Sequence, residues 1–115
     1  MKQNNRKLGS LKEQEAKQYL EGLGYEILET NFYAKGGEID LIAREGEYLV
    51  FIEVKYRSTE KNGNPLEAVT LQKQNKIFHT ANYYMYKNQI PEYTPCRFDV
   101  VAILGEEIVL VKDAF

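Results

Sequence analysis

The sequence predicts a single α/β domain built on a mixed sheet, and three observations lead to this fold class. The chain has 115 residues, which is a common size for one domain and leaves no room for a second core. Segments with strand alternation and segments with helical spacing follow one another in the order α-β-β-β-α-β-β. Because a helix separates the third strand from the fourth, the chain crosses over between them, which places at least one parallel pair in the sheet.

The N-terminal part of the chain is expected to form a helix followed by a strand. Apolar residues recur at helical spacing over 8–23, and Gly24 supplies a stop signal after them. A strand with weaker alternation follows at 25–32, and a glycine-containing loop comes after it at 34–37. This helix therefore precedes the sheet and has one apolar stripe with which to pack against it.

Two strands with clear alternation, at 38–44 and 48–57, are expected to form a hairpin. The dipeptide Glu45-Gly46 between them has the composition of a two-residue turn. With this turn, Arg44 pairs with Glu47, and the register of the whole hairpin follows from that pair.

The second half of the chain is expected to complete the sheet through a second helix. A turn-rich loop at 58–65 leads to a helix at 71–87, for which Thr70 is the N-cap. Two strands at 97–104 and 108–112, joined by a short turn that contains glycine, close the chain.

Composition excludes several classes of protein. The longest apolar runs, 48–52 and 100–104, are far too short to span a bilayer, so no membrane association is expected. The N-terminus lacks the apolar segment of a signal peptide, and the single cysteine, Cys96, excludes an internal disulfide and a multi-cysteine zinc site. These features fit a cytoplasmic protein. A net charge of −2 and an isoelectric point near 5.5 weigh against a general nucleic-acid binder, whose affinity comes from lysine and arginine.

The hairpin carries the most informative pattern in the sequence. Side chains on paired strands alternate with a period of two, so the predicted register divides the hairpin into a charged face and an apolar face. The charged face carries Glu38, Asp40, Glu53, Lys55 and Arg57, and the apolar face carries Ile39, Leu41, Val50, Ile52 and Val54. Nearer the turn the charged face also becomes apolar, and the first helix is expected to cover it.

Asp40 and Glu53 are diagonal neighbours in this register, and Glu38 lies directly opposite Glu53. Diagonal Cβ atoms lie roughly 7–8 Å apart, so the carboxylates of Asp40 and Glu53 can converge on one cation. Oxygen ligands without histidine or thiolate favour magnesium or manganese. The ammonium of Lys55 lies above the same place. The alternative is a surface hairpin whose acidic and basic side chains form cross-strand ion pairs and hold no ligand.

Two segments of the hairpin, GEIDLI at 37–42 and FIEVKYR at 51–57, closely resemble the YraN-like family of small bacterial proteins. That family is similar to the PD-(D/E)XK nuclease superfamily, which has archaeal Holliday-junction resolvases as relatives. The resemblance implies a restriction-endonuclease-like fold, an αβββαβ core with a mixed central sheet flanked by helices. It extends over nearly the whole chain, and outside the hairpin it includes Gly9, Glu13, Ala16, Tyr19, Leu20, Asn31, Lys73, Ile77, Ala81 and residues 97–100. Ile39 stands where the superfamily's nominal motif has proline, which leaves the metal-binding aspartate unaffected.

The resemblance also implies roles for individual residues. Asp40 and Glu53 are expected to bind Mg²⁺ or Mn²⁺. The backbone carbonyl of Val54 and the carboxylate of Glu13, from the first helix, are expected to assist them. Lys55 is expected to position or deprotonate the attacking water and to stabilise negative charge in the transition state.

Two of the acidic residues have alternative roles. Ser10 and Glu13 have the spacing of a capping box, so Glu13 would only cap a helix that begins at Ser10. Glu38 either supports the metal site or is the cross-strand partner of Lys55 or Arg57.

Further residues are candidates for contacts with nucleic acid. Those expected to bind phosphates are Arg57, Lys73 and Lys76, although lysines on a solvated helix face are common. Tyr83, Tyr84 and Tyr86 either stack on bases or pack the second helix. Asp99, in the fourth strand, is expected to have a structural role.

The resemblance, together with these residues, implies a metal-dependent endonuclease that hydrolyses phosphodiester bonds in DNA, including branched or single-stranded structures. DNA is favoured over RNA as the partner, and the resolvase relatives imply a homodimer. The alternative function is a module that keeps the nuclease fold without turnover and binds nucleic acid or another protein.

Overall fold

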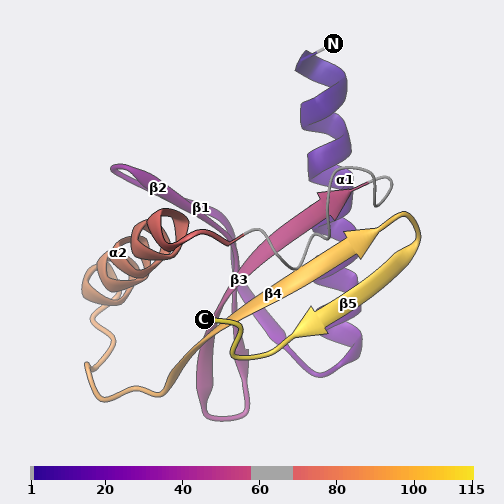
Figure 1. Ribbon diagram of the computed structural model, residues 1–115. Helices are drawn as coiled ribbons and strands as arrows, with labels where there is room; N and C mark the ends of the chain where they lie inside the picture. Colours follow the sequence, from indigo (N-terminus) through magenta and orange to yellow (C-terminus); the bar gives the residue numbers. More distant parts are fainter. Residues whose placement is uncertain (1, 58–68) are drawn as a thin grey trace.

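The computed structural model describes residues 2–57 and 69–115, with side chains from residue 8 onward. The loop predicted at 58–65 lies outside the described residues. The elements follow one another in the predicted order (Figure 1). They are α1 (Lys2–Gly22), β1 (Glu26–Ala34), β2 (Gly37–Glu45), β3 (Tyr48–Arg57), α2 (Leu71–Lys87), β4 (Cys96–Leu104) and β5 (Glu107–Val111).

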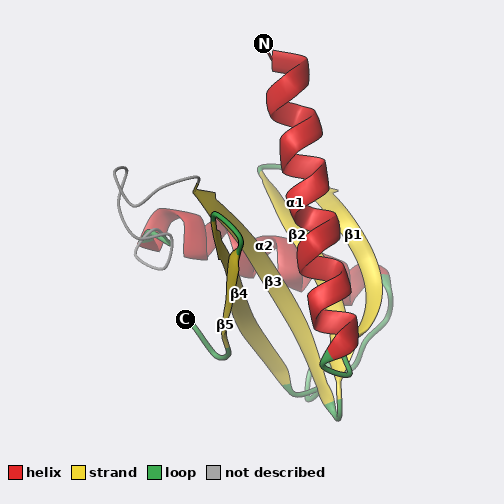
Figure 2. Ribbon diagram, turned by 90° about the vertical axis from the view of Figure 1, so that its right-hand side faces the viewer, coloured by secondary structure: helices red, strands yellow, loops and turns green. Residues whose placement is uncertain are grey.

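In the described part of the chain, five strands form one mixed sheet in the order β1-β2-β3-β4-β5. Neighbouring strands are antiparallel except β3 and β4, which are parallel because α2 connects them. α1 lies on one face of the sheet and α2 on the other (Figure 1, Figure 2). The predicted α/β fold with its crossover is confirmed, and it is consistent with a restriction-endonuclease-like core.

Each helix covers its own hydrophobic cluster. Beneath α1, the side chains of Leu41, Val50 and Ile52 pack with residues of β4. Beneath α2, the cluster includes Ile42, Leu49, Phe51, Ile77, Ala81 and Tyr84. The second helix therefore covers the face on which the charged side chains were expected, and the prediction that the first helix covers it is wrong. Both helices have apolar stripes, and only the crossover through α2 determines which face each one occupies.

α1 is longer than the sequence predicts, since it begins at Lys2 rather than at residue 8. Its N-terminal turns extend beyond the edge of the sheet (Figure 1), where a helix has no core to cover and needs no apolar stripe. Ser10 is consequently inside the helix, and the capping-box interpretation of Glu13 is wrong. The predicted stop signal is confirmed: Gly24 has a φ of +98°, and the N–H of the next residue donates to the carbonyl of Leu20.

The turn of the β2–β3 hairpin is Gly46-Glu47, one residue later than predicted, because Glu45 pairs with Tyr48. Gly46 has a φ of +58°, and a type II′ turn places glycine at the first of its two central positions. The correction moves the register by two residues, so Arg44 pairs with Leu49 instead of Glu47. A shift of two residues keeps the paired side chains of 41–45 and 48–52 on their predicted faces, because the alternation has the same period.

The other elements agree closely with the predictions. β3 and α2 have the predicted bounds, and the hydroxyl of Thr70 caps α2 by accepting a hydrogen bond from the N–H of Lys73 at 3.1 Å. β1 lies slightly later than predicted, and an irregularity between Ile27 and Glu29 explains its weak alternation. β2, β4 and β5 differ from their predicted bounds by one residue. Within the described residues, neither helix combines the length and the apolar character that crossing a bilayer requires.

Candidate functional site

The carboxylates of Asp40 and Glu53 lie where the pairing of β2 with β3 ends. The last pair of this ladder is Leu41 with Ile52, so Asp40 and Glu53 are the first residues beyond it on their strands and do not take the diagonal positions predicted. Beyond that pair the two strands diverge (Figure 1), and the N–H of Val54 donates to Asp40 Oδ2 at 2.8 Å. Only 8% of Asp40 and 7% of Glu53 is exposed. We call this arrangement of Asp40, Glu53 and Val54 the carboxylate fork.

The regular alternation of β2 is interrupted at Asp40. Ile39 packs in the cluster beneath α2, whereas Leu41 packs beneath α1, although side chains two residues apart in a regular strand share a face. The prediction that Ile39 shares a face with Leu41 is therefore wrong, because β2 departs from regular geometry where its ladder with β3 ends. As a result, Asp40 lies near the charge of Glu13 on α1 as well as that of Glu53.

Burial raises the pKa of the Asp40 carboxyl to about 8, and the negative charge of Glu53 adds to this effect. The hydrogen bond from Val54 opposes the shift, because it favours the ionised form. The charges of Glu13 and Glu38 raise the pKa further. Full ionisation of the fork is therefore costly, and a cation bound between its carboxylates would relieve the repulsion.

Basic side chains from two elements approach the carboxylate fork. Lys73 Nζ lies 3.2 Å from Glu53 Oε1, in the first turn of α2, where the Thr70 cap begins the helix. Lys55 follows Glu53 on β3 and is half-buried. Burial lowers the pKa of the Lys55 ammonium, and the positive charges of Lys73 and Arg57 act in the same direction, while Glu53 opposes them. Lys73, a predicted phosphate ligand, is thus paired with a carboxylate, and the charges of Lys73 and Arg57 act on Lys55 beside the fork.

Glu13 reaches toward the sheet from the middle of α1. Its Oε1 accepts a hydrogen bond from Asn31 Nδ2 at 2.8 Å, while Glu15, two residues later, is exposed and pairs with Lys12. Asn31 has a φ of +50°, a conformation that asparagine tolerates better than most residues. Asn31 was part of the family resemblance, but the sequence assigned it no role. The structure shows that it holds Glu13 beside β1.

The acidic side chains do not form a compact three-ligand cluster. Among the described residues, no group of three or more His, Cys, Asp or Glu side chains is placed so that it could hold a metal ion. The fork itself offers two buried carboxylates, and Glu13 is bound to Asn31. The roles of Glu13 and of the Val54 carbonyl as metal ligands stay predictions, and what the structure adds is the N–H of Val54 as a partner of Asp40.

Comparison with known proteins identifies relatives over almost all of this chain. The family described as "Uncharacterised protein family UPF0102" matches residues 12–103. The chain belongs to UPF0102. A UPF0102 protein of Lachnoclostridium phytofermentans is 54% identical, over 97% of this chain and 95% of its own. Those of Colwellia psychrerythraea and Clostridium kluyveri are 42% and 44% identical, over 93% and 96% of this chain and 87% and 95% of theirs. The predicted membership of the YraN-like family is confirmed.

The remaining predicted residues of this UPF0102 protein lie around the fork. Glu38 is opposite Tyr33 in the β1–β2 ladder, and a hydrogen bond between their side chains raises the pKa of the Tyr33 hydroxyl. Tyr33 is thus a partner of Glu38 that sequence reasoning missed, because the register of β1 was not predicted. Lys76 is exposed on α2, one turn after Lys73.

A close contact between α2 and the start of β2 positions the helix that carries Lys73 relative to the strand that carries Asp40. A Cβ atom at Gly37 would collide with the hydroxyl of Thr80 and would lie 3.3 Å from the carbonyl of Lys76. Thr80 is fully buried, and its hydroxyl donates to the Lys76 carbonyl at 2.8 Å. Glycine at position 37 therefore allows α2, and Lys73 with it, to approach β2 closely.

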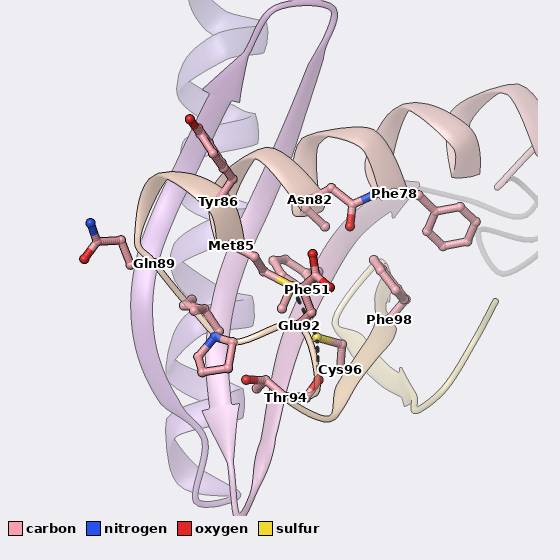
Figure 3. A pocket seen from close by; sticks show the side chains of 13 residues that line it. Phe51, Phe78, Asn82, Met85, Tyr86, Gln89, Glu92, Thr94, Cys96 and Phe98 are labelled. Carbon is pink, nitrogen blue, oxygen red and sulfur yellow. Dashed lines mark hydrogen bonds between the residues drawn. The ribbon is translucent and has the colours of Figure 1, made fainter.

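An apolar cavity of about 1000 Å³ lies elsewhere in the UPF0102 domain, between the second half of α2, β3 and β4 (Figure 3). Its lining includes Phe51, Met85 and Cys96, and Cys96 Sγ lies 3.6 Å from Met85 Sδ. Among the described residues that line it, only Glu92 is charged, and none is a predicted catalytic or phosphate-binding residue. Charged groups do not converge there, so the carboxylate fork is the candidate site.

Proposed function

We propose that this UPF0102 protein is a metal-dependent endonuclease that hydrolyses phosphodiester bonds in DNA. The observation that supports the proposal best is the buried pair Asp40 and Glu53 at the end of the β2–β3 ladder, with Lys55 two residues further along β3. Burial and repulsion oppose the ionisation of Asp40, and a structural role would not require two carboxylates to meet in this way.

The residues of the fork fit a magnesium or manganese ion. Mg²⁺ keeps several water ligands and takes one or two carboxylates together with phosphate oxygens of the substrate, so Asp40 and Glu53 suffice as side-chain ligands. The carbonyl of Val54 and, directly or through water, Glu13 would complete the protein's share. Such an ion neutralises phosphate oxygens and lowers the pKa of a bound water.

The basic residues supply the other half of the chemistry. Lys55 carries its ammonium next to the fork, where it would orient the attacking water and donate to the oxygen that gains negative charge. Its lowered pKa, caused first by burial, makes proton exchange with that water easier. Arg57 and Lys73 would hold phosphates on either side of the scissile bond, and the exposed Lys76 extends this positive surface along α2.

One observation favours the alternative of a fold retained without turnover. The ammonium of Lys73 already lies 3.2 Å from Glu53, so part of the charge of the fork is balanced without a metal ion. A module that binds DNA or a protein would need nothing more.

A panel of substrates tests the proposal. Linear, flapped, single-stranded and four-way-junction DNA, together with RNA, should be incubated with the protein in Mg²⁺, Mn²⁺ or EDTA. Cleavage of DNA is expected with either metal ion and not in EDTA. Titration calorimetry should show Mn²⁺ binding that Asp40→Asn abolishes and that the exposed control Glu15→Gln leaves unchanged. Equal Mn²⁺ affinity in Asp40→Asn and the wild type would remove the fork from the mechanism.

A further inference from the structure

α2 lies beside the β1–β2 hairpin (Figure 1), and three tyrosines of α2 and β1 are exposed. They are Tyr33 on β1, 67% exposed, and Tyr83 and Tyr86 on α2, 46% and 82% exposed. Tyr84, by contrast, is buried and packs edge-on against Phe32. Tyr84 therefore packs the helix, Tyr86 presents its ring to solvent, and Tyr83 is exposed while its ring centroid lies 6.2 Å from that of Phe32.

The exposed tyrosines line two adjoining hollows. One, of about 450 Å³, is lined by Tyr33 and Tyr83 together with Lys35 and His79. The other, of about 410 Å³, is lined by Tyr83, Tyr86 and Lys87. Tyr83 lines both, so the two hollows lie next to each other on its two sides. We call these six residues the aromatic strip: Tyr33, Lys35, His79, Tyr83, Tyr86 and Lys87.

The aromatic strip begins beside the carboxylate fork. Tyr33 is the Cα partner of Glu38 in the β1–β2 ladder, and its hydroxyl is hydrogen-bonded to the Glu38 carboxylate. Glu38 is two residues from Asp40 on the same strand. A ligand that lies along the strip therefore reaches the fork at the Tyr33 end.

The charge of the strip favours a polyanion. Lys35 and Lys87 contribute ammonium groups, and among the described residues that line the two hollows none is acidic. Lys87 Nζ lies 5.8 Å from the ring centroid of Phe32, which keeps it close to the strip. Aromatic faces interleaved with cations are the combination that proteins use to bind single strands, whose unpaired bases can stack on the rings.

We propose that the aromatic strip binds a single strand of nucleic acid, with unpaired bases stacked on Tyr33, Tyr83 and Tyr86 and phosphates bound by Lys35 and Lys87. The inference rests on the proposed function, because it assigns the strip to the substrate of the carboxylate fork. The substrate class that follows is DNA with an unpaired segment adjoining the bond to be cleaved. A fully paired duplex cannot use the strip, since its bases are stacked on each other.

Fluorescence anisotropy with a labelled oligothymidine, measured in EDTA so that no cleavage occurs, tests the strip. Tyr86→Ala is expected to weaken binding by about 5- to 150-fold, the range for loss of one stacked base, and Tyr83→Ala by a similar factor. Tyr86→Phe, which keeps the ring, should bind like the wild type. Tyr93→Ala, an exposed tyrosine outside the strip, is the matched control and should have no effect. Duplex DNA should bind all four variants as it binds the wild type.

The salt dependence supplies a second measurement that does not depend on packing. Lys35→Ala and Lys87→Ala should each lower the slope of log affinity against log salt by about 0.7 for single strands. Unchanged affinity for oligothymidine in Tyr86→Ala and Tyr83→Ala, with melting temperatures like that of the wild type, would overturn the inference and leave the tyrosines as a surface for a protein partner.

The two proposals fail in distinguishable ways. If Asp40→Asn abolishes cleavage but the tyrosine variants bind oligothymidine normally, the proposed function stands and the strip does not. If the tyrosine variants lose single-strand affinity while no substrate is cleaved with any metal ion, the strip stands as a binding site and the nuclease proposal fails.

Discussion

Two clusters of charged side chains in the same sheet differ in the partners that their buried carboxylates have. Around Asp99, a cluster that we call the arginine network, the guanidinium of Arg97 donates to Asp99 at 2.9 Å and to Glu45 at 2.6 Å. The hydroxyl of Tyr25 donates to Asp99 at 2.8 Å, and Lys112 pairs with Glu45 at 2.9 Å. In the carboxylate fork two acids meet instead, and the buried partner of Asp40 is a main-chain N–H.

The pKa values of Arg97 and Asp40 shift in ways that reflect their different partners. The hydrogen bond to Asp99 raises the pKa of Arg97, because the pair stabilises the charged guanidinium. Burial and the charge of Glu53 raise the pKa of Asp40 to about 8, which disfavours its charged form. The arginine network thus gives Asp99 charged and polar partners within the fold, which fits the structural role predicted for it, whereas the fork carries an electrostatic cost that a ligand can relieve.

The largest effect on stability is expected from breaking the arginine network. Arg97→Ala leaves the fully buried Asp99 without its cation, and removing one partner of a buried pair costs about 3–5 kcal/mol in the free energy of unfolding. Urea denaturation measures this loss. Arg44→Ala, which removes an exposed arginine next to Glu45, is the control and should change stability little. A loss below about 1 kcal/mol in Arg97→Ala would show that the network is not a stabilising cluster.

In the carboxylate fork, removing a basic side chain should affect turnover rather than stability. Lys55→Ala is expected to lower the rate of DNA cleavage by about 10²–10³, equivalent to about 2.7–4 kcal/mol of transition-state stabilisation. Metal binding should remain, because an ammonium has no lone pair for a cation. Single-turnover rates and melting curves measure the two effects, with Lys112→Ala as the matched lysine in the arginine network. Normal cleavage with a lowered melting temperature would place Lys55 among the structural residues.

Asp40→Asn should stabilise the protein, in contrast to any loss of charge in the arginine network. The folded-state pKa of Asp40, about 8, lies above its ordinary value of 3.8, so the folded state holds a proton that the unfolded state has released. Stability of the wild type should therefore fall as the pH rises from about 4 to 8. In EDTA at pH 8.5 the variant should be more stable by at least about 1.4 kcal/mol, the equivalent of one pKa unit.

Thermal melts of wild type and Asp40→Asn between pH 5 and 9 (about the window in which the carboxyl titrates) measure this difference. Glu53→Gln is the companion variant, since removing the neighbouring charge should also flatten the pH dependence. Parallel melting curves for wild type and Asp40→Asn across the whole range would contradict the electrostatic cost assigned to the fork.

The smallest effects should come from the exposed cation at the rim of each cluster. Lys73 and Lys112 have similar exposures, 46% and 51%, and each pairs with one carboxylate, so either alanine variant should lose less than about 1 kcal/mol of stability. The two differ in the proposed function. Lys73→Ala should lower the salt slope of duplex DNA binding by about 0.9, and Lys112→Ala should not change it. Equal slopes would remove Lys73 from the DNA-binding surface.

The sequence predictions are most accurate for features that residues close together in the sequence determine. β3 and α2 have the predicted bounds because alternation and the Thr70 cap are local signals. The hairpin turn was wrong by one residue, since the composition of Glu45-Gly46-Glu47 does not show which central position glycine takes. Within the paired part of the hairpin, side chains kept their predicted faces because the register moved by two residues, which is the period of a strand.

The site was predicted in part for the same reason. Asp40, Glu53 and Lys55 share a short segment of sequence and a hairpin, so strand geometry predicts that they lie near one another, although it does not predict that the ladder ends before Asp40. The partners that come from elsewhere were not predictable. Asn31 beside Glu13 and Tyr33 beside Glu38 depend on a β1 register that local pattern does not define.

The sequence by itself determined the α/β class, the crossover and the acidic and basic residues of the central hairpin, because each is recorded in local composition and spacing, while its resemblance to known proteins indicated the family. Tertiary structure alone decided which helix covers the charged face, where the β2–β3 ladder ends and which cation pairs with Glu53. It also decided that Asp99 is paired with an arginine, whereas Asp40 accepts a hydrogen bond from the N–H of Val54 and lies beside the charge of Glu53. Burial and the distances between charges arise only when distant segments pack together, and these two quantities separate a stabilising cluster from a candidate site.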